Sequence, residues 1–221
     1  MKYEAILFDL DGTLLDTALD LADATNYVLK KHNVAPISDA QAKRYASDGM
    51  RALLKSGIDK EKWNQYDFEE MRLEFLEYYN THINVRTVFF KDMDKLLNTL
   101  NQNNIKVGVV TSKPDHLANL LLRKFKEFNF ISEIVGCDLL TKSKPDPEPL
   151  FYTCNKLNVD PKKCVYIGDH IRDIEAGRNA NMDTVLAKWG YIKEEDDLQS
   201  FNATYIADDV AHLAKIIGIE L

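Results

Sequence analysis

Cysteine is scarce in this chain of 221 residues, which contains only Cys137, Cys154 and Cys164. They form no CxxC pair, so the sequence signals neither a zinc site nor a disulfide framework, and buried free thiols are expected. Long apolar runs are also missing, and none approaches the roughly 18–20 residues that a membrane-spanning helix needs. The segment that starts at Met1 reaches an acid at Asp9, too early to hold the apolar region of a signal peptide. We therefore expect a cytoplasmic protein without a membrane partner.

Positive charge is in deficit, with 28 lysines and arginines against 35 aspartates and glutamates and a formal net charge of −7. This balance disfavours nucleic acid as a partner, because polyanions are bound mainly through cationic side chains. Hydrophobic residues make up 45% of the chain, a share typical of globular proteins. The length suffices for one domain of ordinary size and a smaller insertion.

Short apolar runs alternate with helical patterns along most of the chain. Helices are indicated by apolar residues spaced i, i+3, i+4, i+7 over Met93–Leu100, Leu117–Phe125 and Val210–Ile217. Strands are predicted at Tyr3–Phe8, Ile105–Val110, Ile134–Cys137, Val165–Ile167 and Thr184–Ala187, with a weaker sixth at Tyr205–Ala207. This alternation predicts an α/β fold whose core is a Rossmann-like, doubly wound parallel sheet covered by helices on both faces.

One segment breaks the alternation. Residues 16–85 contain helical patterns but no convincing strand, and Ser38 is a candidate cap for one of these helices. We therefore predict a catalytic α/β core made of residues 1–15 and 86–221, with an all-helical domain inserted after the first strand at residues 16–85.

Two acids follow the first predicted strand, at Asp9 and Asp11, and Gly12 comes directly after them. Side chains at i and i+2 of an extended chain point to the same side, and glycine then permits a sharp turn. Two carboxylates that face one crevice repel each other unless a cation joins them, and a hard, oxygen-preferring Mg²⁺ suits this position.

Two further loops carry candidate phosphate-binding groups. Thr111 and Ser112 follow the strand predicted at Ile105–Val110, and a hydroxyl near a helix N-terminus can hold an anion. Lys144 lies in a proline-rich loop, where a fixed lysine could offset negative charge on Asp9 and on a bound anion.

Asp169 follows the strand predicted at Val165–Ile167, and Asp173 lies one helical turn later, which brings the two to the same side. Asp169 is a candidate metal ligand. Asp173 is either a ligand or a group that orients Lys144 and water. His170 is interpreted as a residue at the rim of the site, because Mg²⁺ prefers oxygen. All these motifs lie at the carboxyl ends of predicted parallel strands, the edge where open α/β sheets bind ligands.

The motifs at Asp9/Asp11, Thr111 or Ser112, Lys144 and Asp169/Asp173 resemble the four-motif signature of the haloacid dehalogenase superfamily of phosphatases. The resemblance covers essentially the whole chain, and residues 16–85 look like that superfamily's helical cap. Several stretches, such as 9–17, 110–114 and 143–147, are similar to its phosphoglycolate phosphatase group, and 168–180 with 189–192 are similar to the branch that includes N-acetylmuramic acid 6-phosphate phosphatases. The group usually has Ala-Gly-Met where this chain has Ala180-Asn181-Met182, and asparagine tolerates the left-handed backbone that such a turn needs.

The resemblance implies a Mg²⁺-dependent phosphatase of a small phosphorylated metabolite. Asp9 would become phosphorylated, and Asp11 would protonate the leaving group and later activate water. Mg²⁺ would be held by Asp9, the backbone near Asp11 and Asp169, with Asp173 as a further candidate. Thr111 or Ser112 and Lys144 would grip the phosphate oxygens.

The helical insertion would close over the site and contact the organic part of the substrate. Arg51 is a candidate for binding a substrate carboxylate, with an exposed surface arginine as the alternative. The preferred substrate is 2-phosphoglycolate, with N-acetylmuramate 6-phosphate as the alternative. The motifs are also compatible with a phosphomutase of the β-phosphoglucomutase type and, outside the enzymes, with a phospho-accepting receiver module. Either a monomer or a homodimer is compatible with the sequence.

Overall fold

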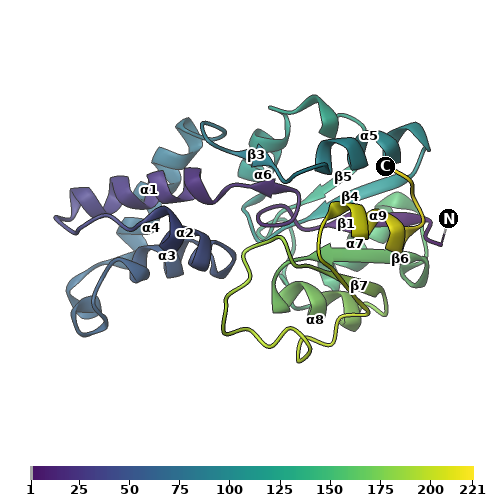
Figure 1. Cartoon of the computed structure of the whole chain (residues 1–221). Helices are drawn as coiled ribbons and strands as arrows, with labels where there is room; N and C mark the ends of the chain where they lie inside the picture. Colours follow the sequence, from purple (N-terminus) through teal and green to yellow (C-terminus); the bar gives the residue numbers. More distant parts are fainter. Residues whose placement is uncertain (1) are drawn as a thin grey trace. The chain divides into compact units, whose positions relative to one another are not determined.

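The computed structural model describes residues 2–221. The chain folds into two compact units: Met1–Leu15 with Phe89–Leu221 form the first, and Asp16–Val88 form the second. Figure 1 shows the elements of both units in their order along the chain. Within residues 2–221, no helix combines the length and the apolarity that crossing a bilayer would take.

The first unit is built on a six-stranded parallel sheet in the order β5-β4-β1-β6-β7-β8. Its strands are β1 (Ala5–Phe8), β4 (Lys106–Val110), β5 (Glu133–Val135), β6 (Cys164–Gly168), β7 (Asp183–Ala187) and β8 (Tyr205–Ala207). Because β1 lies between β4 and β6, the direction of winding reverses there, which is the topological switch point of a doubly wound sheet.

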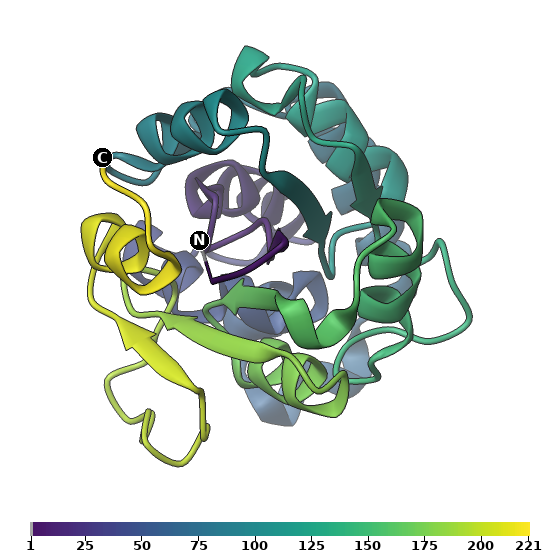
Figure 2. The ribbon, with the colours of Figure 1, turned by 90° about the vertical axis from the view of Figure 1, so that its right-hand side faces the viewer.

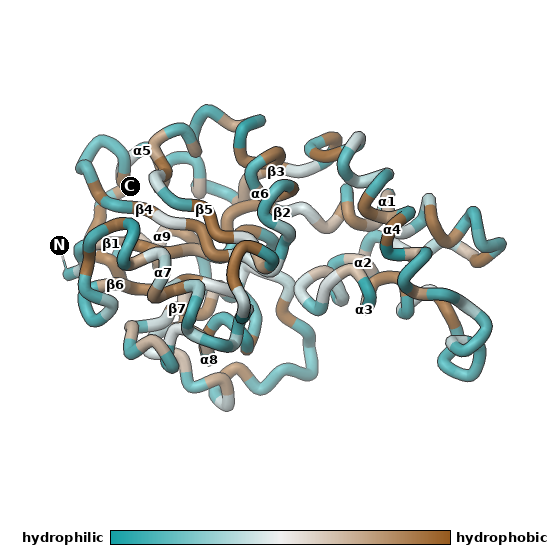
Figure 3. Tube along the Cα trace, turned by 180° about the vertical axis from the view of Figure 1, so that it is seen from behind, coloured by the Kyte–Doolittle hydropathy of each residue, from teal (hydrophilic) through white to brown (hydrophobic). Residues whose placement is uncertain are grey.

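The central strands are apolar along their length because helices cover both faces of the sheet. All residues of β1 and β6 are buried, and Figure 3 shows the strands as the most hydrophobic part of this unit. All six predicted strands are present, with ends that differ by at most two residues. The predicted α/β fold with a Rossmann-like core is thus confirmed.

Helices lie on both sides of the sheet (Figure 2). One side carries α7 (Glu148–Leu157) and α8 (Ile171–Asn179), and the other carries α5 (Met93–Gln102) and α9 (Val210–Ile217), which contact each other. Helix α6 (Asp115–Leu122) contacts β5 and ends earlier than the predicted Phe125. After Leu122 the chain forms turns in which the backbone N–H groups of Lys124 and Phe125 donate to the carbonyls of the third residue before each. Short 3₁₀ turns at Lys126–Phe128 and Pro161–Lys163 complete the unit.

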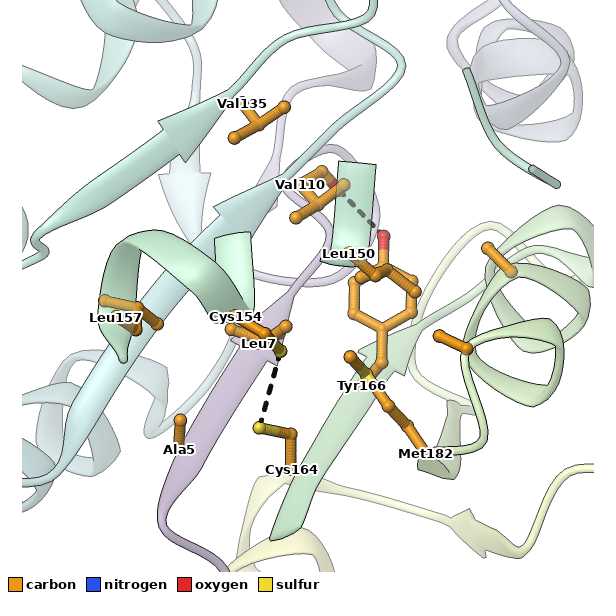
Figure 4. Close-up of a cluster of buried hydrophobic side chains, with 12 residues drawn as sticks. Ala5, Leu7, Val110, Val135, Leu150, Cys154, Leu157, Cys164, Tyr166 and Met182 are labelled. Carbon is orange, nitrogen blue, oxygen red and sulfur yellow. Dashed lines mark hydrogen bonds between the residues drawn. The ribbon is translucent and has the colours of Figure 1, made fainter. Parts of the chain in front are cut away.

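The core beneath α7 and α8 is drawn in Figure 4. It includes Leu7 from β1, Leu150 and Cys154 from α7, and Cys164 and Tyr166 from β6. The sulfur atoms of the two cysteines lie 3.6 Å apart in this core. Both thiols are free and buried as expected, whereas the free thiol of Cys137 is only half-buried.

The second unit contains four helices in its described residues, α1 (Ala18–Lys31), α2 (Asp39–Tyr45), α3 (Met50–Ser56) and α4 (Phe68–Thr81), with 3₁₀ turns at Ala46–Asp48 and Lys60–Gln65. Helix α1 packs against the other three. Ser38 caps α2 by accepting the backbone N–H of Gln41, as predicted.

The ends of the second unit are joined by Asp20, which is 2% exposed. Its carboxylate accepts the backbone N–H groups of Val85, Arg86 and Thr87 and the Thr87 hydroxyl, over 2.6–3.1 Å. One buried carboxylate in the first turn of α1 therefore holds the segment that leaves the unit.

The chain passes between the units through β2 (Leu15–Asp16) and β3 (Val88–Phe89), which pair with each other in a separate two-stranded sheet. The sequence predicted no strand in residues 16–85. This was wrong at one residue, since Asp16 belongs to β2. Strands of two residues are too short to show the alternation by which strands are recognised.

Candidate active site

The predicted motifs of the first unit meet at one edge of its sheet. Asp9 follows β1, Thr111 follows β4 and Asp169 follows β6, and these three strands are neighbours in the sheet. Because the strands are parallel, their carboxyl ends share an edge. The order β4-β1-β6 therefore places the three loops side by side at the topological switch point.

Asp9 is buried, and its two oxygens have different surroundings. Oδ1 accepts a hydrogen bond from Lys144 Nζ at 2.9 Å. Within residues 2–221, every buried side-chain oxygen or nitrogen has a hydrogen-bond partner. Oδ2 has none in that range. Asp9 Oδ2 is therefore the oxygen through which this side chain, 10% exposed, reaches the surface. Burial raises the pKa of Asp9 to about 6, although the charge of Lys144 acts in the opposite direction.

Asp11 belongs to a tight turn in which the N–H of Gly12 donates to the carbonyl of Leu15. Gly12 has a φ of +84°, and a Cβ atom there would lie 2.3 Å from Asp169 Oδ2, so only glycine fits. The Asp11 carboxylate does not join the other acids: its Oδ1 lies 3.1 Å from Nζ of Lys113. Lys113, whose side chain is 5% exposed, was not singled out from the sequence.

The two hydroxyl candidates after β4 differ in exposure. Thr111 is buried, and its Oγ1 accepts the backbone N–H of Lys113 at 3.1 Å. Ser112 is exposed. Helix α6 begins only at Asp115, with Pro114 before it, so neither hydroxyl caps that helix.

Lys144 lies at the centre of a buried polar network. Its Nζ is 2.6 Å from Asp173 Oδ1, 2.9 Å from Asp9 Oδ1, 3.0 Å from the Tyr166 hydroxyl and 3.2 Å from the carbonyl of Val110. Burial alone would lower the pKa of Lys144, but the charges of Asp173 and Asp9 raise it to about 12. The lysine is therefore held in place by four contacts, and the neighbouring carboxylates favour its charged form.

Tyr166 is a member of this network that the sequence reasoning missed. Its hydroxyl donates to the Val110 carbonyl at 2.7 Å, as Figure 4 shows. Burial, with the nearby charge of Asp173, holds the pKa of Tyr166 well above its usual range, so the hydroxyl keeps its proton. The available signal was a tyrosine inside an apolar strand, because a buried phenol needs a hydrogen-bond partner.

Asp9, Asp169 and Asp173 form a buried carboxylate group whose ligand atoms all lie within 4.8 Å of one another, and such a group could bind a metal ion. Asp169 Oδ1 accepts from the Thr13 hydroxyl at 3.3 Å, and its Oδ2 accepts the backbone N–H of Tyr191 at 2.9 Å. If all are ionised, three carboxylates and the single ammonium of Lys144 leave two negative charges uncompensated. A divalent cation would offset them.

The remaining candidates lie around this group or outside it. Asp173 is held in the first turn of α8 by the backbone N–H of His170, at 3.0 Å. His170 uses Nδ1 to accept from the N–H of Arg172 and is not part of the carboxylate group. Arg51 belongs to the second unit, where it is exposed and lines a groove of about 650 Å³. The predicted turn at Asn181 has the left-handed backbone that was expected, with a φ of 58°.

Comparisons with known proteins agree with this geometry. A family model described as haloacid dehalogenase-like hydrolase matches residues 6–187. N-acetylmuramic acid 6-phosphate phosphatase of Pseudomonas putida is 35% identical and aligns with 100% of this chain and 99% of its own length. Phosphoglycolate phosphatase of Psychrobacter arcticus is 33% identical, and the alignment covers 98% of this chain and 96% of that protein.

Among solved structures, a crystal structure described as a predicted phosphoglycolate phosphatase from Haemophilus somnus 129PT is similar with a TM-score of 0.87. It is 27% identical, and the match covers 98% of this chain and 99% of that one.

The chain belongs to the haloacid dehalogenase-like hydrolase family. This confirms the resemblance that was stated from the motifs. The family and the phosphatases among its relatives support the expected enzyme class, that of a phosphoric monoester hydrolase.

Proposed function

We propose that this protein is a Mg²⁺-dependent phosphatase that acts through an aspartyl phosphate on Asp9. The two unlike oxygens of Asp9 carry the proposal. Lys144 holds Oδ1, whereas Oδ2 is open to the surface and is the atom free to attack phosphorus. A nucleophile fixed through one oxygen and exposed through the other suits covalent catalysis.

Each further residue has a proposed task. Asp9 Oδ2 forms the bond to phosphorus while Asp11 gives a proton to the leaving oxygen. Asp11 then takes a proton from the water that releases phosphate. Lys144 offsets charge on Asp9 and on a phosphate oxygen, and the loop of Thr111 and Ser112 contacts the remaining oxygens. Thr111 Oγ1 accepts the N–H of Lys113, which leaves its O–H to donate to a phosphate oxygen, and Ser112 is the more exposed of the two hydroxyls.

The carboxylates of Asp9, Asp169 and Asp173 would hold the Mg²⁺, with the Asp11 backbone carbonyl as a further candidate. The donor set fits, since these are hard oxygen ligands, mutually close and short of positive charge. The Asp11 carboxylate is not part of this group and contacts Lys113. When bound, Mg²⁺ polarises the phosphate and offsets the repulsion between it and Asp9.

We propose 2-phosphoglycolate as the substrate and N-acetylmuramate 6-phosphate as a second candidate, which is favoured by the 35% identity to the Pseudomonas putida enzyme. Both carry a carboxylate, for which Arg51 of the helical unit, acting as a cap, is the proposed partner. A cytoplasmic location, a monomeric or homodimeric state and the lack of nucleic acid and membrane partners remain predictions.

The test measures phosphate released from a panel of esters by the purified chain with Mg²⁺. The panel contains 2-phosphoglycolate, N-acetylmuramate 6-phosphate, β-glucose 1-phosphate and several sugar phosphates. Asp9→Asn removes the nucleophile, and Asp208→Asn is its matched control, because Asp208 is an exposed carboxylate paired with Lys188. We expect a chelator or Asp9→Asn to abolish release, Mg²⁺ to restore it after chelation, and Asp208→Asn to have no effect.

The pattern of substrates then decides between the candidate functions. The ester with the highest kcat/KM identifies the substrate. Conversion of β-glucose 1-phosphate to its 6-phosphate without phosphate release would favour a phosphomutase. Failure of the folded, Mg²⁺-loaded protein to release phosphate from every ester would contradict the proposed function.

A further inference from the structure

Two buried lysines contact the first motif, one for each of its aspartates. Lys144 Nζ lies 2.9 Å from Asp9 Oδ1, and Lys113 Nζ lies 3.1 Å from Asp11 Oδ1. Lys144 is part of the signature from which the site was predicted, but nothing in the proposed mechanism uses Lys113. Burying an ammonium group is costly unless a partner compensates it, so the position of Lys113 requires an explanation.

Both members of the Lys113–Asp11 pair sit on backbone that is tightly held. The N–H of Lys113 donates to Thr111 Oγ1 at 3.1 Å, and its carbonyl accepts the N–H of Cys137 at 3.1 Å. Asp11 forms a β-bridge with Leu15, beside the hydrogen bond from Gly12 to the same residue. Since hydrogen bonds hold both backbones, the contact between the two side chains orients the Asp11 carboxyl group.

The geometry points to Lys113 as a positioning residue for the reaction, one that holds the carboxyl of Asp11 in the orientation for proton transfer to the leaving oxygen. This rests on the proposed function. In the step concerned, the bond from Asp9 Oδ2 to phosphorus forms and the ester P–O bond breaks. The electron pair of the broken bond stays on the leaving oxygen, which takes the proton of Asp11. The arrangement resembles an acid–base residue that a third group orients.

Esters with different leaving groups separate the role of Lys113 in proton transfer from any other role. An alkyl ester such as 2-phosphoglycolate leaves as a basic alkoxide that needs the proton, whereas p-nitrophenyl phosphate leaves as a stable phenolate that does not. Comparing kcat/KM for the two esters therefore reports on proton delivery in the phosphorylation of Asp9, separately from phosphate binding and folding. Whichever alkyl ester the panel identifies as a substrate serves as the first member of the pair.

The experiment compares Lys113→Met with the wild type. We expect kcat/KM for the alkyl ester to fall about 100-fold, the lower end of the usual contribution of general acid catalysis, and kcat/KM for p-nitrophenyl phosphate to fall less than about tenfold. Lys113→Arg, which keeps the charge, should recover part of the lost rate. Lys188→Met is the matched control, because Lys188 pairs with Asp208 at the surface, and it should leave both rates unchanged.

A double-mutant cycle with Asp11→Asn sharpens the result. Once Asp11 cannot give a proton, adding Lys113→Met should cost little further activity on the alkyl ester, because the two residues act as one unit. Additive losses would contradict the proposal.

Two further results would each overturn the positioning role. Equal losses on both esters with a weaker inhibition constant for inorganic phosphate would make Lys113 a phosphate ligand. Equal losses with a lower melting temperature would make it a structural residue. Either result leaves the phosphatase intact. A wild type that releases phosphate from neither ester would overturn the proposed function, and the role of Lys113 with it.

Discussion

Lys144 Nζ donates to Asp173 Oδ1 over 2.6 Å, and both side chains are only 2% exposed. The same carboxylate group accepts the backbone N–H of His170, so Asp173 is anchored to the start of α8. Besides Asp9, Lys144 is thereby held by a residue that does not react in the proposed mechanism.

Replacing Lys144 should therefore impair both catalysis and folding. We expect Lys144→Met to lower kcat by about 10²–10³-fold, because one preorganised charge at the phosphate is lost. The free energy of unfolding without metal should fall by about 3–5 kcal/mol, since buried carboxylates lose their partner. Phosphate release and urea unfolding measure the two effects. Lys142→Met, at an exposed lysine two positions away, should change neither; a kcat within tenfold of the wild type for Lys144→Met would be contrary to expectation.

The Tyr166 hydroxyl allows a finer test of the same network. Tyr166→Phe should lower the free energy of unfolding by about 1–3 kcal/mol, because the hydroxyl's hydrogen bonds with the Val110 carbonyl and with the charged Lys144 are lost. Urea unfolding checks this. Tyr152→Phe is the matched control, since Tyr152 is only half-buried and contacts Lys156 through its ring, which phenylalanine keeps, and it should stay within about 0.5 kcal/mol of the wild type. Equal stabilities of the two variants would show that the hydroxyl contributes nothing.

Asp20 provides a prediction for the helical unit. Asp20→Ala should destabilise this unit by about 3 kcal/mol, because three backbone N–H groups, among them the buried one of Thr87, lose a charged acceptor. Hydrogen exchange at the amides of residues 85–87 should accelerate strongly, which separates this effect from unfolding elsewhere. Asp23→Asn, at a 40% exposed carboxylate paired with Arg86, should cost at most about 1 kcal/mol. Unchanged exchange at residues 85–87 would show that Asp20 does not hold this segment.

The stability of the helical unit should depend on pH through Glu74. Burial alone would raise the pKa of Glu74, but hydrogen bonds from Lys31 and His32 outweigh it and lower the pKa below its ordinary value of 4.5. A lowered pKa in the folded state means that the stabilisation is present above pH 4.5 and is lost as the pH falls through the folded value. Urea unfolding between pH 6 and pH 3 should show this loss, and Glu74→Gln should reduce it. An identical pH profile in Glu74→Gln would argue against the assignment.

The sequence predicted the features that local pattern determines. Apolar runs revealed the strands because buried parallel strands need apolar side chains on both faces. Their ends then indicated Asp9 and Asp169. Ser38 followed from the capping preference of the serine side chain, and Asn181 from the tolerance of asparagine for a left-handed backbone. The sheet order β5-β4-β1-β6-β7-β8, which brings the loops of Asp9, Thr111 and Asp169 together, is a property of the whole chain.

What the sequence did not reveal depends on contacts between distant segments. Lys113 and Tyr166 have ordinary local surroundings, a polar loop and an apolar strand, and acquire partners only when β1, β4 and β6 align. The contact of the Asp11 carboxylate with Lys113 likewise joins two separate loops, and the spacing of Asp9 and Asp11 gave no sign of it.

The pairing of β2 with β3 means that the helical segment enters and leaves through two adjacent strands. Asp20 also joins the first helix of the segment to residues 85–87 near its end. The segment is thus a module whose first and last residues lie side by side. Such a module can be exchanged for one of different length without changing the order of strands in the sheet. If the helical unit contacts the organic part of the substrate, as proposed, replacing the whole unit would change substrate preference while the carboxylates and lysines of the sheet edge stay unaltered.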